Sequence, residues 1–160
     1  EVMGIDLSFP KAFLKAQIAA GIKLPKTGKV FISVKDLDKN DLIIDTAKIM
    51  LKLGFQIIAT KGTASFLKAH NVKTDQVYKV YELRPNIVDL LKDNMIDLIF
   101  NTTEGSQSVE DSREIRSIAL KNKVPYYTTA SGCHSAALAI ESSRGEDINV
   151  FSLQELISQQ

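Results

Sequence analysis

A chain of 160 residues with 20 basic and 19 acidic side chains is long enough to bury one core, and its net charge of +1 gives no general attraction to nucleic acid or to an acidic membrane surface. Its 44% hydrophobic content is that of an ordinary globular domain, and no apolar run approaches the roughly 20 residues that span a bilayer. Cys133 is the only cysteine, which excludes an internal disulfide and fits a reducing compartment such as the cytoplasm.

Short apolar strands alternate with helical patterns along most of the chain. In chain order the predicted elements are a helix at 9–20, a strand at 30–34, a helix at 38–53, a strand at 55–60, a helix at 63–70, a strand at 77–81, a helix at 86–94, a strand at 96–100, a helix at 108–121, a strand at 125–129, a helix at 133–141 and a last edge strand at 149–153.

Turn and capping residues mark the boundaries of these elements. The glycines and the proline of 21–28 predict a linker between the first helix and the first strand. Asp38 is expected to cap the second helix and Gly54 to end it, while Asn71 suits a left-handed helix end. Each strand is thereby separated from the next by a helix.

Continuous apolar strands that alternate with helices predict a parallel sheet with both faces covered. We therefore expect an α/β fold, doubly wound, with a mainly parallel five-stranded sheet flanked by helices. In such folds a ligand binds beyond the carboxyl ends of the strands, so the residues that follow each strand are the candidates for function.

Hydroxyls, amides, lysines and glycines gather at these strand ends, and the clearest case is IIATKGTASFL at 57–67. The residues that we predict to bind an anion are Lys79 within the third strand and, at the strand ends, Ser33, Lys39, Thr60, Gly62, Thr63, Asn101, Thr102 and Thr103. A helix start offers unpaired N–H groups and a positive dipole end, and hydroxyls and lysines add donors and charge, as a phosphate requires. For a single threonine, helix capping is the commoner role; the set at several strand ends favours binding.

Other reactive side chains predict no catalytic or metal site. Two distant histidines, His70 and His134, and one cysteine do not make a metal site, so we expect no metal. Cys133 and His134 are neighbours in sequence, which does not establish a nucleophile and its base. No catalytic residue is predicted.

Six stretches occur in the order and spacing of a known family: ISVKDLDK, GFQIIATKGTASFL, VYKVYELRPNI, LIFNTTEG, EDSREIRSIAL and VPYYTT. They resemble the carboxy-terminal regulatory domain of the large subunit of carbamoyl phosphate synthetase, which belongs to the methylglyoxal-synthase-like fold group. The first 21 residues resemble the end of the preceding ATP-grasp synthetase half. We therefore expect 1–28 to be the tail of that half plus a linker, 29–160 to be the regulatory domain, and the chain to be part of a longer enzyme.

The resemblance implies a nucleotide effector, UMP or IMP, at the strand ends. Phosphate and ribose contacts would come from Ser33, Lys39, Thr60, Thr63 and Lys79, and the loop facing the nucleotide from Asn101, Thr102 and Thr103. Tyr126 and Thr128 match the part of an ornithine site that this domain contributes. Tyr127 stands where relatives that respond to ornithine carry an aspartate.

The resemblance further implies a parent enzyme that is an ATP-dependent, glutamine-hydrolysing ligase using Mg or Mn, acting in pyrimidine and arginine biosynthesis. Its partners would be the remaining synthetase domains of the large subunit and a glutaminase small subunit; this domain would hold no cofactor and would be non-catalytic by itself.

Three alternatives stay open. Members of the methylglyoxal synthase branch carry an aspartate base in a segment after the third strand, where this chain reads ELRPN, with Arg84 and no aspartate, so the missing base argues against that activity. The inosinate cyclohydrolase branch binds a purine monophosphate at the same helix start. A homo-oligomerisation role, alone or together with regulation, is the third.

Overall fold

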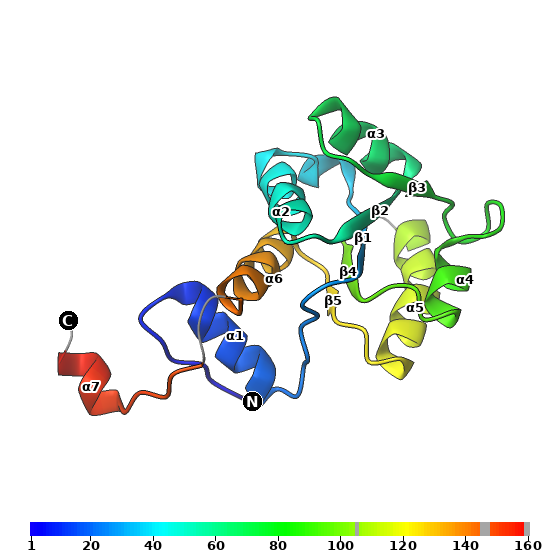
Figure 1. Ribbon diagram of the computed structural model, residues 1–160. Helices are drawn as coiled ribbons and strands as arrows, with labels where there is room; N and C mark the ends of the chain where they lie inside the picture. The colour runs from blue at the N-terminus through cyan, green and yellow to red at the C-terminus, as the bar shows by residue number, and fades with distance from the viewer. Residues whose placement is uncertain (105, 145–147, 159–160) are drawn as a thin grey trace.

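A parallel sheet forms the centre of the protein, and the computed structural model describes it within residues 1–104, 106–144 and 148–158. Five strands pair in the order β3-β2-β1-β4-β5 (Figure 1), and every pair is parallel. Their bounds are β1 Lys29–Ser33, β2 Gln56–Thr60, β3 Asp75–Val77, β4 Leu98–Asn101 and β5 Tyr126–Tyr127. The order runs outward from β1 in both directions, so the predicted doubly wound α/β fold is confirmed.

Helices cover both faces of the sheet (Figure 1). Their bounds are α1 Phe9–Ala19, α2 Asp41–Lys52, α3 Lys61–Ala69, α4 Ile87–Lys92, α5 Ser106–Lys121, α6 Ala130–Ser142 and α7 Leu153–Ser158, with a short 3-10 turn η1 at Asp36–Asp38. Side chains of α2, α3 and α6 pack on one face and those of α4 and α5 on the other. The two apolar clusters make the strands buried on both sides, as their continuous apolar sequences predict.

Helix α1 lies outside the sheet and packs against α6. Leu14 is its buried residue, and Phe13 reaches the sheet, where its ring centroid lies 6.3 Å from that of Tyr127. Arg144, just after α6, donates hydrogen bonds to the carbonyl oxygens of Lys26 and Leu53, which attaches the 21–28 segment to the end of α2. The division of the chain after residue 28 stays a prediction.

Two of the predicted strands differ in the structure. The strand expected at 77–81 is wrong beyond Val77, because the chain turns there: the Lys79 N–H donates to Glu82 Oε2 at 2.8 Å and Tyr81 takes a φ of 67°. The edge strand expected at 149–153 is also wrong. Ser152 and Glu155 cap each other's N–H groups at 3.2 and 2.7 Å, and this capping box begins α7 instead.

The capping residue predicted for the second helix is also wrong. Asp38 ends the turn η1, and the side chain of Asn40 accepts hydrogen bonds from the N–H groups of Leu42 and Ile43 at the start of α2. The predicted left-handed positions are confirmed, with φ of 80° at Gly54 and 61° at Asn71. Within the described residues, no helix combines the length and hydropathy that a bilayer-spanning segment needs.

Cys133 lies in the apolar cluster between the sheet and α6, and its side chain is fully buried. Burial raises the pKa of this thiol to about 12, from an ordinary value of 9.0, with a smaller contribution from the charge of Asp38. The thiolate fraction at neutral pH is then roughly a thousandfold lower than that of an exposed thiol.

We therefore expect native Cys133 to resist iodoacetamide and to be labelled rapidly only after unfolding in urea. Mass spectrometry of the labelled chain measures both rates. Rapid labelling in native buffer, at the rate found in urea, would contradict the burial described above.

Candidate functional site

Hydroxyl groups connect the carboxyl ends of β1, β2 and β4. Ser33 Oγ lies 3.1 Å from Thr60 Oγ1, which joins β1 to β2. Just beyond β1, the N–H of Val34 donates to Thr63 Oγ1 and the N–H of Lys35 donates to Thr102 Oγ1, both at 3.1 Å. These strand ends lie beside the point between β1 and β4 where the strand order reverses, the usual ligand position in doubly wound sheets.

The threonines of this group are buried, with exposed fractions of 4% for Thr60, 1% for Thr63 and 4% for Thr102. Thr60 occupies the N-cap position of α3, but no side chain caps this helix start. The helix-capping role that is commoner for a single threonine does not apply to Thr63, because its hydroxyl accepts a hydrogen bond from the Val34 N–H. At the start of α3, as at every helix start, the first backbone N–H groups have no hydrogen-bond partner within the helix.

Lys39 lies beside this group. Lys39 Nζ is 2.6 Å from Asp36 Oδ1, and a Cβ added at Gly62 would lie 3.2 Å from the same nitrogen. The hydrogen bond and charge of Lys39, with a smaller contribution from the charge of Lys79, hold the pKa of Asp36 below its ordinary value of 3.8. A glycine at position 62 thus permits the approach of the Lys39 ammonium to the first turn of α3.

Asn101 ends β4 in register with Ser33, and it is 4% exposed. Its side-chain nitrogen donates to Ser112 Oγ on α5 at 3.1 Å and to the Tyr126 hydroxyl on β5 at 2.5 Å. Thr103 follows and is half-buried. Gly105 and the side chains of 106–108 and 111 lie outside the described residues, so the start of α5 adds nothing further to this site.

The residues predicted for ornithine lie at the edge of the sheet. Tyr126 is half-buried, with the Arg116 guanidinium 5.4 Å from its ring centroid, and Thr128 is exposed just after β5. Tyr127 points to the other face of the sheet, where its hydroxyl donates to Gln17 Oε1 at 2.8 Å. Burial raises the pKa of the Tyr127 phenol, and the nearby Cys133 adds to the shift.

The carboxylates in the segment after β3 are part of its turn and of the next helix start. Glu82 is exposed and accepts from the Lys79 N–H. Asp89 accepts from the Asn86 N–H at 2.9 Å, in a capping box at the start of α4, and lies 3.5 Å from the Arg84 guanidinium. The loop that a methylglyoxal synthase would use for its base therefore carries carboxylates with structural contacts.

The two histidines also have local partners. His134 Nδ1 lies 3.0 Å from Thr46 Oγ1, which joins α6 to α2, and His70 Nδ1 lies 2.9 Å from the Phe66 carbonyl oxygen at the end of α3. Among the residues that the structure describes, no three His, Cys, Asp or Glu side chains are grouped as metal ligands would be.

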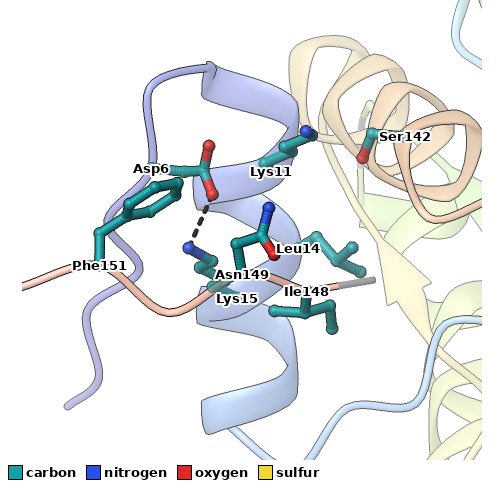
Figure 2. Close-up of a pocket in the computed structure, with 8 residues that line it drawn as sticks. All are labelled: Asp6, Lys11, Leu14, Lys15, Ser142, Ile148, Asn149 and Phe151. Atoms are coloured by element: carbon teal, nitrogen blue, oxygen red, sulfur yellow. Dashed lines mark ion pairs between the residues drawn. The ribbon is translucent and has the colours of Figure 1, made fainter. Parts of the chain in front are cut away.

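A pocket lies elsewhere, between α1, the end of α6 and the segment before α7 (Figure 2). It holds about 320 Å³, including its open mouth, and it is lined by Asp6, Lys11, Leu14, Lys15, Ser142, Ile148, Asn149 and Phe151. An ion pair joins Lys15 Nζ to Asp6 Oδ2 at 2.7 Å, and the Phe151 ring centroid lies 4.9 Å from the same nitrogen. None of the eight lining residues is a predicted strand-end residue.

Sequence reasoning missed two residues that shape the strand-end site. Asp36 pairs with Lys39 three residues later, a spacing visible in KDLDK, and Ser112 on α5 accepts from Asn101. The pairing of Asp36 with Lys39 had a signal in the sequence. The contact of Ser112 with Asn101 depends on how α5 packs.

Comparison with known proteins identifies the family. The MGS-like domain family matches residues 42–128, more than half of the chain. The chain is 42% identical over 155 residues to the carbamoyl phosphate synthase large chain of Brucella suis, covering 97% of this chain and 13% of that protein. The corresponding protein of Halomonas eurihalina is 48% identical over 159 residues, covering 98% of this chain and 14% of that protein.

The C-terminal section of the Methanopyrus kandleri large chain is 46% identical over 157 residues, covering 98% of this chain and 29% of that section. The chain therefore spans only 13–14% of the full-length large chains cited above. A family match over most of the sheet, and the all-parallel doubly wound fold, agree with the resemblance found in the sequence. The chain belongs to the MGS-like domain family.

Proposed function

We propose that this chain is the regulatory section of a carbamoyl phosphate synthase large chain and that it binds a nucleoside monophosphate, UMP or IMP, at the ends of β1, β2 and β4. It acts within a glutamine-hydrolysing, ATP-dependent ligase that uses Mg or Mn, together with the remaining synthetase domains and a glutaminase small subunit. The domain itself contributes regulation rather than chemistry to pyrimidine and arginine biosynthesis.

One observation carries the proposal: hydroxyls from three strand ends, the threonines among them buried, lie beside a helix start without a side-chain cap and beside a lysine. Ser33 and Thr60 contact each other at 3.1 Å, and Thr63 and Thr102 accept from the N–H groups of Val34 and Lys35, directly after Ser33. Gly62 allows the Lys39 ammonium to lie against the first turn of α3. Such a collection of donors around a helix start suits a phosphate group.

Several donors are needed because each is weak alone. A charge near a helix start is stabilised by roughly 0.3–1 kcal/mol when exposed and by up to about 2 kcal/mol when partly buried. Lys39 pairs with Asp36, and the charge of Lys79 acts on the same carboxylate, which supports a contribution of both lysines to anion binding. A doubly charged phosphate would gain from both lysines together with the hydroxyls and N–H groups.

The regulation that we propose acts through the loops of this site. A bound phosphate would tighten the loops after β1, β2 and β4, and these loops would then favour one arrangement of the neighbouring synthetase domains. Coupling free energies between allosteric sites are typically about 1–3 kcal/mol. Ornithine is a secondary proposal, supported by the exposed position of Thr128 directly after β5.

Isothermal titration calorimetry of this chain tests the proposal. UMP and IMP are expected to bind with the heat of a single site, and uridine, which lacks the phosphate, is expected to give no binding at the same concentrations. The absence of binding by both nucleotides at millimolar concentration would reject the effector site and favour a role in assembly alone. Turnover of dihydroxyacetone phosphate at an enzyme-like rate would favour a lyase.

A further inference from the structure

Two consecutive tyrosines in β5 contact opposite sides of the sheet. The Tyr126 hydroxyl accepts from Asn101 Nδ2 at 2.5 Å, at the end of β4. The Tyr127 hydroxyl donates to Gln17 Oε1 at 2.8 Å, on helix α1. Successive side chains of a strand point to opposite faces, so one short strand connects the strand-end site with α1.

Tyr127 contacts α1 from the sheet. Its ring centroid lies 6.1 Å from that of Phe100 on β4, in an edge-to-face arrangement, and 6.3 Å from that of Phe13 on α1. Together with the bond to Gln17, these ring contacts place Tyr127 between β4 and α1. Helix α1 also packs on α6, so Tyr127 contributes part of its attachment and not all of it.

The strand that carries both tyrosines is short and lies at the edge of the sheet. It has two residues, Tyr126 and Tyr127, and its partner among the described strands is β4. Asn101, at the other end of the Tyr126 bond, is followed by Thr102, which accepts from Lys35 and donates its own N–H to the Ser33 carbonyl oxygen at 3.0 Å. Asn101 thus contacts β5 directly through the Tyr126 hydroxyl.

We infer that Tyr126 and Tyr127 act as positioning residues that link the strand-end site to helix α1, so that an anion bound at the strand ends holds α1 more firmly. The ligand in this inference rests on the proposed function, but the link between Asn101 and Gln17 does not. Tyr127→Phe tests the link selectively, because it removes one hydroxyl and keeps the ring contacts. A tyrosine phenol is protonated at neutral pH, so the Tyr127 hydroxyl can donate to Gln17.

Hydrogen exchange of the α1 amides, followed by mass spectrometry on this chain, tests the link. In the unsubstituted protein, saturating UMP or inorganic phosphate is expected to slow exchange in α1 about fivefold, the factor that corresponds to a net hydrogen bond of about 1 kcal/mol. In Tyr127→Phe the same ligand is expected to bind, as calorimetry would report, and to leave α1 exchange unchanged. Tyr81→Phe, at a tyrosine that is 75% exposed, is the matched control and should respond like the unsubstituted protein. An equal slowing in Tyr127→Phe would overturn the inference.

A second measurement needs no ligand and decides the inference even if no nucleotide or phosphate binds. Tyr126→Phe and Gln17→Met do not alter groups that touch each other, since Tyr127 stands between them. If the link exists, Tyr126→Phe speeds hydrogen exchange of the α1 amides in the protein that keeps Gln17. In the protein that carries Gln17→Met, adding Tyr126→Phe has no further effect on this exchange. If the effects of the two substitutions on α1 exchange simply add, the link is rejected. Exchange of the α2 amides is the control for a general loss of stability. Failure of UMP and phosphate to bind would reject the proposed function alone.

Discussion

Replacing Lys39 with methionine is expected to weaken UMP binding by about tenfold or more, because a charge-assisted hydrogen bond contributes roughly 1.5–3 kcal/mol. The side chain keeps its length and apolar stem but loses the ammonium that lies beside Gly62. Calorimetric titration of the variant and of the unsubstituted protein measures the change in dissociation constant. Lys68→Met, in the last turn of α3 and exposed, is the matched control and should bind UMP as before.

The companion change of the partner carboxylate should act in the opposite direction. Asp36→Asn removes a negative charge from the vicinity of the bound phosphate and releases Lys39 from its ion pair. We expect UMP affinity to rise. In the native protein the pKa of Asp36 is lowered, chiefly by the hydrogen bond from Lys39, so the ion pair persists above the ordinary value of 3.8 and is lost as the pH falls through the lowered value. A loss of affinity in both variants would contradict a site at Lys39 and would indicate general disruption of the loop.

Replacing Phe100 with alanine is expected to have the largest effect on stability, lowering the free energy of unfolding by about 3–5 kcal/mol. Phe100 is fully buried in β4, where it contacts the Tyr127 ring and fills the cluster between the sheet and α6. The surrounding helices can close only part of the cavity. Because whole domains are stable by only about 5–15 kcal/mol, this loss is a large share of the total.

Urea denaturation, monitored by circular dichroism, measures this change as a shift of the midpoint. Phe9→Ala removes the same side chain from α1, where it is 62% exposed, and should shift the midpoint little. Equal shifts in the two variants would mean that Phe100 does not occupy the packed position described here.

Patterns of apolar residues in the sequence were sufficient for the central strands and the fold class. The strands at 30–34, 55–60 and 96–100 are continuous apolar runs between helical patterns, and a parallel sheet covered on both faces is the arrangement that buries them. The left-handed helix ends at Gly54 and Asn71 could also be predicted, since few residues other than glycine and asparagine adopt this conformation readily.

The gathering of hydroxyls at the strand ends could also be predicted, because parallel strands bring their carboxyl ends to one edge of the sheet. The hydrogen-bond partners of those hydroxyls could not be predicted. Thr63 accepts from Val34, which lies 29 residues earlier in the chain, and Asn101 turns toward Tyr126, 25 residues later. Contacts over such separations depend on the packing of α3 and β5 and leave no periodic signal.

The short segments at the edges were decided by single contacts. The apolar residues of 149–153 suit a strand as well as a helix, and the reciprocal bonds between Ser152 and Glu155 start α7. The turn at Lys79 to Glu82 ends β3 early for a similar reason. The sequence by itself determined the parallel α/β core and the edge of the sheet where a ligand is expected, because apolar strands that alternate with helices are buried by a parallel sheet with helices on both faces. Only the tertiary structure decided the Lys39–Asp36 pair beside Gly62 and the connection of Asn101 to Gln17 through two tyrosines, because these depend on which side chains the packed helices bring within hydrogen-bond distance.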